Sequence, residues 1–265
     1  PADLILTVDV GRLSDAKGAG VTQAVEDPML NEVIPRQYRD SDGHWFGLTT
    51  RARVIYAAKD RVAPGDIRRY EDLADPKWRG RVCTRSGGHE YQVGLIAAMI
   101  AHHGADGARR WLAGVKANLA RRPQGNDRSQ VRAIKEGLCD LALGNSYYYG
   151  NMLQDAEQAE WARAVNVVFP NQGDRGTHVN LSGMALTQSA PNRAEAVRLM
   201  RFLVSEAAQR MYAERNFEYP IRQGVPWSDL LTDLGDFLAD GIDLAKVAAY
   251  RPAAIRLVNE VDYDG

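Results

Sequence analysis

The segment NDRSQVRAIKEGLCDLALGNSYYY, residues 126–149, decides the fold class of this chain. Asn126 or Asp127 can cap a short amphipathic helix, and Gly137 is typical of the end of such a helix. An apolar strand is expected over 138–143, after which a turn leads into three consecutive tyrosines. This succession of helix, strand, turn and new segment is typical of α/β proteins.

The same alternation extends along most of the chain. Strands are expected at 4–8, 45–48, 53–58, 81–84, 138–143 and 165–169, and the segment 180–186 has a mixed pattern. Helices are expected at 14–19, 66–73, 89–103, 105–118, 229–239, 243–247, 251–260, after 126 and from 191 onward. We therefore expect mostly parallel sheets flanked by helices. No internal repeat or low-complexity linker is visible, so two lobes would be joined by ordinary strands.

The composition excludes several classes of protein. With 45% hydrophobic and 25% charged residues over 265 positions, the chain is globular rather than disordered or fibrous. A formal net charge of -1 argues against nucleic-acid binding. No apolar run approaches the roughly 20 residues of a membrane helix. The chain begins at Pro1 inside a strand pattern, without a signal peptide, so we expect the natural protein to start further upstream.

Motifs of catalysis are missing from the sequence. There is no Gly-x-Ser-x-Gly elbow, no P-loop and no His-Glu-x-x-His. The carboxylates show no obvious acid/base pair. The histidines lack metal-ligand spacing; they are His44, His89, His102, His103 and His178. We therefore predict that the protein is not an enzyme.

Three consecutive tyrosines, at 147–149, follow the apolar strand. They could simply bury two rings and expose the third. Alternatively, they line a ligand site, because ligands of open α/β sheets bind beyond the carboxyl ends of strands. Tyr91 has the same setting after the turn at 86–88. A phenolate is a hard anionic ligand, and it suits Fe(III), which can displace the phenol proton.

Two pairs of residues stay ambiguous on the sequence alone. Cys83 and Cys139 both sit at strand-like positions, and they are either two buried free thiols or one disulfide between neighbouring strands. Arg51 and Arg53 are candidate anion partners, each with an ordinary surface ion pair as the alternative. Because side chains two apart share one face of a strand, spacing does not choose between them.

Several motifs together resemble the periplasmic ferric-ion-binding proteins of bacterial ABC importers, in particular the branch that uses several tyrosines. The resemblance covers nearly the whole chain. The matching stretches are TVDVGRL at 7–13, GLTTRARV at 47–54, YEDLADPKWRG at 70–80, VCTRS at 82–86, GLCD at 137–140 and NSYYYG at 145–150. The segment 73–78 is shared widely by two-lobed solute-binding proteins, whereas the tyrosine cluster is specific to iron.

This resemblance implies a ligand set. The adjacent tyrosine ligands of the family fall on Tyr147 and Tyr148, and its preceding single ligand falls on Tyr91. Tyr149 is then a second-shell or structural residue. Further family ligands, a tyrosine and often a histidine, precede Pro1 in the family pattern, so the iron site of this chain is expected to be incomplete.

The resemblance also implies roles for residues outside the tyrosines. Asp9 is the nearest match to a glutamate ligand of some relatives and is a second-shell candidate, as are Arg51 and Arg53. Cys83 and Cys139 match cysteines of this branch, which favours a disulfide.

The implied fold is a two-lobed periplasmic solute-binding protein of type II, each lobe a mixed, mostly parallel sheet flanked by helices. We expect lobe 1 at 1–50 and 170–235, and lobe 2 at 51–169 and 236–265. Fe(III), alone or with a synergistic anion, would bind in the interlobe cleft of a monomer and pass to an ABC transporter permease. The alternative is the same fold binding a polyamine, thiamine or a small anion, the last favoured by Arg51, Arg53 and Arg85.

Overall fold

The computed structural model describes residues 2–265, and the chain divides into two compact units. Unit 1 comprises Pro1–Arg51, Asn180–Gly235 and Ile242–Ala249; unit 2 comprises Ala52–Val179, Asp236–Gly241 and Tyr250–Gly265. These bounds differ from the predicted lobes in three places: Arg51 and residues 242–249 belong to unit 1, and 170–179 belong to unit 2. Each unit is described below by itself.

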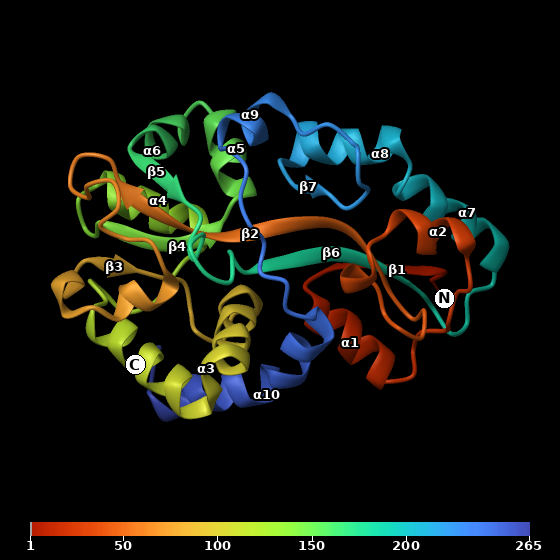
Figure 1. Cartoon of the computed structure of the whole chain (residues 1–265), viewed down its shortest axis with the longest axis horizontal. Coiled ribbons are helices and arrows are strands. Elements are labelled where there is room, and N and C mark those ends of the chain that lie inside the picture. Colours follow the sequence, from red (N-terminus) through yellow and green to blue (C-terminus); the bar gives the residue numbers. More distant parts are fainter. Residues whose placement is uncertain (1) are drawn as a thin grey trace. The chain divides into compact units, whose positions relative to one another are not determined.

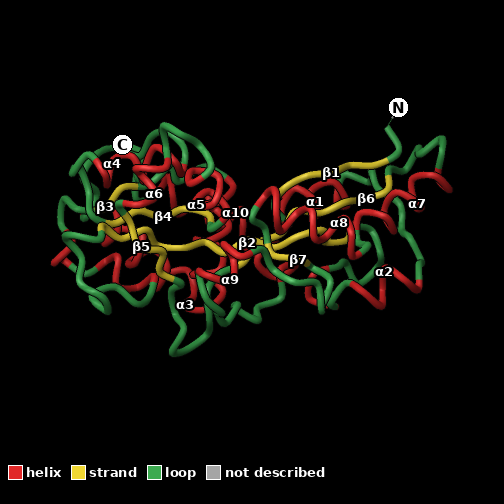
Figure 2. The backbone as a smooth tube through the Cα atoms, turned by 90° about the horizontal axis from the view of Figure 1, so that it is seen from above, coloured by secondary structure: helices red, strands yellow, loops and turns green. Residues whose placement is uncertain are grey.

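Unit 1 contains a sheet in the order β1, β6, β2 (Figure 1). β1 (Leu4–Val8) pairs antiparallel with β6 (Val179–Leu186), and the two strands also run side by side in Figure 2. The short β7 (Tyr219–Pro220) pairs with β2 (Phe46–Ala58) at Thr49 and Thr50. The helical segments of this unit are α1 (Val10–Gly18), α2 (Pro28–Val33), η1 (Arg36–Tyr38), α7 (Arg193–Leu203), α8 (Glu206–Met211), η4 (Tyr212–Asn216) and α9 (Asp229–Asp233).

In unit 2, the second half of β2 lies between β4 (Leu141–Asn145) and β5 (Val165–Val168). β3 (Val82–Cys83) pairs with the other side of β4. α4 packs against β4 and α6 against β5, and Figure 1 shows α4, α5 and α6 grouped beside these strands. The helical segments here are η2 (Tyr70–Ala74), η3 (Pro76–Trp78), α3 (Glu90–Ala117), α4 (Asp127–Lys135), α5 (Tyr147–Leu153) and α6 (Ala159–Arg163). α10 (Leu244–Glu260) begins in unit 1 and ends in unit 2.

The sheets are mixed, as predicted, but the expected excess of parallel pairs is wrong. Among the described pairs, β3–β4 is parallel, whereas β1–β6, β2–β4, β2–β5 and β2–β7 are antiparallel. β3 and β4 are joined through α3 and α4, the crossover that makes neighbouring strands parallel. The alternation of helices and strands does not predict the direction of β2. This strand comes from an earlier part of the chain and runs antiparallel to β4 and β5.

Most predicted elements are present, but the helix expected at 229–239 ends at Asp233, and two further corrections concern continuity. The strands expected at 45–48 and 53–58 are one strand, β2, and all its residues are buried. The residues between them contain no Gly or Pro, and Thr49 and Thr50 are paired with β7, so nothing interrupts the strand. Similarly, the helices expected at 243–247 and 251–260 are one helix, α10, which continues through Pro252.

The residues predicted to cap, end or interrupt helices are confirmed. Asn126 caps α4 by accepting a hydrogen bond from the Ser129 amide at 3.0 Å. Gly137 follows that helix with a φ of 78°, and Gly104 kinks α3 with a φ of 69°. Both angles lie in the left-handed region that glycine adopts without strain.

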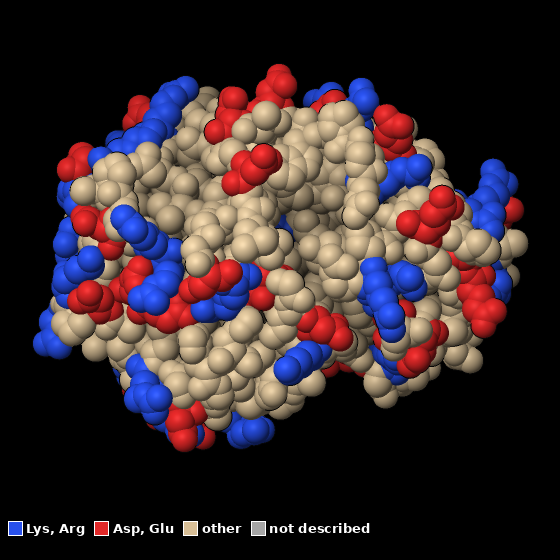
Figure 3. Space-filling model, in the orientation of Figure 1, with Lys and Arg blue, Asp and Glu red and all other residues tan. Residues whose placement is uncertain are grey.

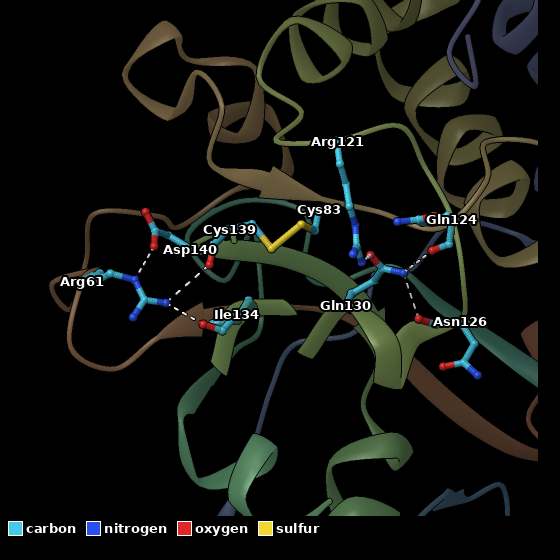
Figure 4. Close-up of a disulfide and its surroundings, with 9 residues drawn as sticks. All are labelled: Arg61, Cys83, Arg121, Gln124, Asn126, Gln130, Ile134, Cys139 and Asp140. Atoms are coloured by element: carbon cyan, nitrogen blue, oxygen red, sulfur yellow. Dashed lines mark hydrogen bonds and ion pairs between the residues drawn. A yellow bond between two sulfur atoms is a disulfide. The ribbon is translucent and has the colours of Figure 1, made fainter. Parts of the chain in front are cut away.

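A disulfide between Cys83 and Cys139 confirms the second alternative for the cysteines (Figure 4). Cys83 is in β3 and Cys139 lies two residues before the start of β4, so the bond links β3 to the segment that leads into the neighbouring strand. Figure 4 also shows Arg61 beside it, bonded to the Asp140 carboxylate at 2.5 Å and the Ile134 carbonyl at 2.7 Å. The ends of α4 and β4 are thus tied to the loop after β2.

Basic and acidic side chains are interspersed on the face of the molecule that Figure 3 shows. They do not form the single-sign stripe expected of a nucleic-acid-binding face there. Within residues 2–265, none of the helices combines the length and the apolarity that crossing a membrane requires.

Candidate metal centre

Two strand–turn–helix segments of unit 2 carry the candidate tyrosines. β3 ends at Cys83 and a turn leads to α3, in which Tyr91 is the second residue. β4 ends at Asn145, and Tyr147 is the first residue of α5. Because β3 and β4 are parallel neighbours, their carboxyl ends meet at one edge of the sheet. The topology therefore brings together residues that are 56 positions apart.

The three predicted ligands form one group. The phenol oxygens of Tyr91 and Tyr147 are 3.3 Å apart, within hydrogen-bond distance. The rings of Tyr147 and Tyr148 have centroids 4.3 Å apart and planes inclined by 37°. All three side chains are partly exposed, so a ligand can reach them. Tyr149 lies two positions after Tyr147 on α5, about 200° around the helix axis, and therefore points to another side.

Local contacts hold the turn before Tyr147. The Tyr56 hydroxyl donates to the Asn145 carbonyl at 2.7 Å, and the Ser146 hydroxyl accepts from the Ala52 amide at 3.2 Å. Gly144 is required beside Tyr56, because a Cβ there would approach the Tyr56 ring to 2.4 Å. Thus β2 fixes the direction in which the chain leaves β4.

The turn before Tyr91 is held by residues that follow α10. The Asp264 carboxylate accepts from the Ser86 hydroxyl at 2.7 Å and from the Gly87 amide at 2.8 Å. The Tyr263 hydroxyl lies 3.0 Å from that of Thr84. A Cβ on Gly87 would come within 2.7 Å of the Tyr263 ring, so this position also requires glycine.

Buried charges lie directly beside the tyrosine segments. The carboxylate of Asp127, at the start of α4, pairs with Arg53 at 2.7 Å and with Arg85 at 3.1 Å. It also accepts from the Asn145 amide at 2.9 Å. The Arg85 guanidinium lies 5.1 Å from the centre of the Tyr91 ring, and Arg128 lies 5.5 Å from that of Tyr148. Both distances are within the range of cation–π contacts.

Burial favours the neutral form of the three consecutive tyrosines, Tyr147, Tyr148 and Tyr149. It raises the pKa of Tyr147 far above its usual value, and the neighbouring Tyr148 and Tyr91 raise it further. Burial also raises the pKa of Tyr148, where the nearby Asp127 acts in the same direction and Arg85 in the opposite one. For Tyr149, burial alone raises the pKa. A cation that binds Tyr147 and Tyr148 as phenolates has to displace these protons.

The structure separates the remaining predicted site residues. Arg53 lies among the tyrosine segments, where it donates to the side chains of Asn145 at 3.1 Å and Gln92 at 3.3 Å. Arg51 belongs to unit 1 and donates to the Ser182 hydroxyl at 3.2 Å. Asp9 also belongs to unit 1, where it caps α1.

The contacts of Asp9 are structural ones. Its carboxylate accepts from the Gly11 amide and from the Asn180 side chain, both at 2.8 Å. The side chain is fully buried, and the backbone φ of 77° is unusual for a residue other than glycine. These contacts tie the start of α1 to β6.

Sequence reasoning did not assign Asp127 or Arg128 to the site. Asp127 was considered only as a possible helix cap, whereas its buried carboxylate contacts two arginines. The available signal was its position: an acidic residue at a helix start often meets buried donors. No group of three or more His, Cys, Asp and Glu side chains in residues 2–265 is arranged to hold a metal ion.

Comparison with known families gives one match that covers most of the chain. The family described as bacterial extracellular solute-binding protein matches residues 1–231. Iron uptake protein A2 of Synechocystis is 44% identical over 267 residues, which span 99% of this chain and 77% of that protein. The major ferric iron-binding protein of Neisseria meningitidis serogroup B is 26% identical over 85% of this chain and 67% of its own length.

Solved structures show the same likeness. The apo ferric ion-binding protein A of Pasteurella haemolytica superposes with a TM-score of 0.96 at 49% identity, covering 100% of this chain and 84% of that one. The Trichodesmium IdiA (FutA) protein, solved in complex with iron and citrate, has a TM-score of 0.96 at 40% identity. The match covers 99% of this chain and 84% of that one. These values confirm the predicted type II fold.

Proposed function

The chain belongs to the bacterial extracellular solute-binding proteins, and from this premise we propose that it captures ferric iron for import. Tyr91, Tyr147 and Tyr148 are the proposed ligands, each as a phenolate. The observation that carries the proposal is the grouping of these three phenols at the ends of two parallel strands, with two of the oxygens 3.3 Å apart. The names of the related proteins, iron uptake and ferric ion-binding, support the same cargo.

The chemistry of the group suits a trivalent hard cation. Phenolate oxygens are anionic and hard, and three of them balance the charge of Fe(III). Because the pKa values of Tyr147 and Tyr148 are raised, a cation has to displace the protons of both phenols when it binds them as phenolates. Binding therefore releases protons, and iron affinity falls as the pH falls.

Delivery completes the proposed function. The protein would act in the periplasm as a monomer and pass its iron to the permease of an ABC transporter. Binding in a cleft between two lobes, and a synergistic anion at Arg51 or Arg53, stay predictions. The comparisons do not favour the alternative solutes, a small anion, a polyamine or thiamine, and the matching family is one of binding proteins.

A visible absorption titration of the full-length protein with ferric citrate tests the proposal. Iron bound by phenolates absorbs visible light, so a saturable band is expected for the wild type. Tyr147→Phe and Tyr148→Phe should each lose most of the band and bind iron far more weakly. Tyr250→Phe is the matched control, since this partly exposed tyrosine lies on α10 outside the group; it should leave both unchanged.

Two results would contradict the proposal in different ways. If the folded wild type showed no band and no saturable iron binding, ferric iron would not be the cargo, and an anionic or organic solute would be tested next. If iron bound equally well to wild type, Tyr147→Phe and Tyr148→Phe, the cargo would stand and the assigned ligands would be wrong.

A further inference from the structure

A single buried carboxylate connects all the segments that carry the candidate ligands. Asp127 is fully buried at the start of α4. One of its oxygens contacts Arg53 at 2.7 Å and the Asn145 amide at 2.9 Å, two residues before Tyr147. The other oxygen contacts Arg85 at 3.1 Å, in the turn before Tyr91. We refer to Asp127, Arg53 and Arg85 as the carboxylate hub.

The two arginines extend the hub to the tyrosines themselves. Arg85 places its guanidinium 5.1 Å from the centre of the Tyr91 ring. Arg53 donates to Gln92, the residue after Tyr91, at 3.3 Å, and to Asn145 at 3.1 Å. Replacing Asp127 would therefore disturb the positions of both segments that carry the tyrosines. Among the contacts of α4 described above, only those of Asp127 reach both segments.

The hub also has an unbalanced charge. It holds two guanidiniums against one carboxylate, and the side chains of Arg53 and Asp127 are 2% and 0% exposed. In addition, four buried donor nitrogens of this region have no hydrogen-bond partner within residues 2–265: Nε of Arg53, Nε of Arg85, Nε2 of Gln92 and Nδ2 of Asn145. A surplus of positive charge and free donors favours negatively charged oxygen nearby.

We propose, on the basis of the proposed function, that the carboxylate hub is the positioning and tuning element of the iron site. Asp127 orients Arg53 and Arg85, and through them the segments of Tyr91 and Tyr147. The surplus positive charge of the arginines stabilises the phenolates and sets how readily bound iron is reduced. Residues around metal ligands commonly act in this way, by orienting the ligands and adjusting the properties of the metal.

Orientation and charge predict different results in substituted proteins. Arg85→Gln and Asp127→Asn both break the hub, so both should weaken iron binding, by about 10- to 100-fold. Their effects on the reduction potential of bound iron should be opposite, because positive charge favours the reduced ion. Loss of the Arg85 charge lowers the potential, whereas loss of the Asp127 charge raises it. A role in folding alone would not produce opposite shifts.

The experiment measures iron affinity by competition with citrate and the reduction potential by spectroelectrochemical titration of the visible band. The variants are Arg85→Gln, Arg85→Lys and Asp127→Asn, in the full-length protein. Arg85→Lys keeps the charge and should keep the potential, while it loses affinity. Arg132→Gln is the control on the same helix, since Arg132 is exposed and pairs with Glu136.

The outcomes separate this inference from the proposed function. A normal wild-type band together with unchanged affinity and potential in Arg85→Gln would overturn the hub, and the tyrosine ligands would stand. Potentials that shift in the same direction in Arg85→Gln and Asp127→Asn would overturn the tuning role. If Asp127→Asn does not fold, the two Arg85 variants decide the question, because the Arg85 side chain is 10% exposed and lies at the end of the hub.

Discussion

Arg51 and Arg53 lie two residues apart on β2, yet they belong to different units and have different partners. Arg51 is 1% exposed and donates to Ser182, whose hydroxyl in turn donates to Glu218 at 3.2 Å. Arg53 is 2% exposed and pairs directly with Asp127 at 2.7 Å. The same residue type on the same face of one strand thus enters two unrelated polar clusters.

The contacts of each arginine are set by partners from distant parts of the chain. Ser182 is 131 positions from Arg51, and Asp127 is 74 positions from Arg53. Unit 2 also contains a disulfide and the two buried ion pairs of Asp127. We therefore expect substitutions in unit 2 to have larger effects than comparable substitutions around Arg51.

The largest effect is expected from Arg53→Met. Breaking a buried ion pair costs about 3–5 kcal/mol, and this change also removes the hydrogen bonds that Arg53 donates to Asn145 and Gln92, while Asp127 keeps only Arg85 as its charged partner. Peptides of unit 2 should then exchange deuterium faster, and the urea midpoint should fall. If the free energy of unfolding fell by less than about 1 kcal/mol, the size typical of an exposed ion pair, the Arg53–Asp127 pair would contribute no more than a surface pair.

The disulfide should come next in size. Cys83 and Cys139 close a loop of 56 residues, and losing such a bond costs about 2–4 kcal/mol. The double substitution Cys83→Ser with Cys139→Ser should lower the midpoint of unfolding, and faster hydrogen exchange should be confined to unit 2. If hydrogen exchange became equally fast in peptides of unit 1, the disulfide would not stabilise unit 2 in particular.

An intermediate effect is expected from acid at Glu71. Burial raises the pKa of this carboxyl, but hydrogen bonds from Asn171 and the charge of Arg175 outweigh it and lower the pKa to about 2. Since the usual value is 4.5, the stabilisation is complete above that pH and is lost as the pH falls toward 2. Unfolding measured across this range should show a steeper loss in wild type than in Glu71→Gln. Identical profiles would mean that Glu71 does not carry the acid sensitivity.

The smallest effect is expected from Ser182→Ala in unit 1. The change removes the hydroxyl between Arg51 and Glu218 and should cost about 1 kcal/mol, the net contribution of an ordinary hydrogen bond. Urea unfolding measures this loss, with Ser41→Ala as an exposed control. If Ser182→Ala proved as damaging as Arg53→Met, the cluster around Arg51 would be as rigid as the hub.

The local elements were predictable because their signals lie within a few residues. Asn126 and Gly137 mark both ends of α4, and Gly104 marks the kink of α3. These residue types act through their own backbone preferences and short-range hydrogen bonds. The direction of β2 could not be predicted in this way, because strand pairing depends on which segments meet in three dimensions.

The candidate site shows the same division. The placement of Tyr91 and Tyr147 after strand-like segments was visible in the sequence, and so was the pair of cysteines. The contact of Asp127 with both arginines was not visible, because it joins β2, the turn before α3 and the start of α4. The choice between Arg51 and Arg53 also depended on these long-range contacts.

Sequence patterns were enough to predict the α/β class, both ends of α4, the kink of α3 and the positions of the tyrosines after strands. These features follow from hydrophobic periodicity and from residues that act over one turn of chain. Only the tertiary structure decided that β2 is one continuous antiparallel strand, that Cys83 meets Cys139, and that Asp127 joins the tyrosine segments. A buried contact depends on which distant residue the fold brings close, and the residues adjacent in the sequence do not indicate which one that will be.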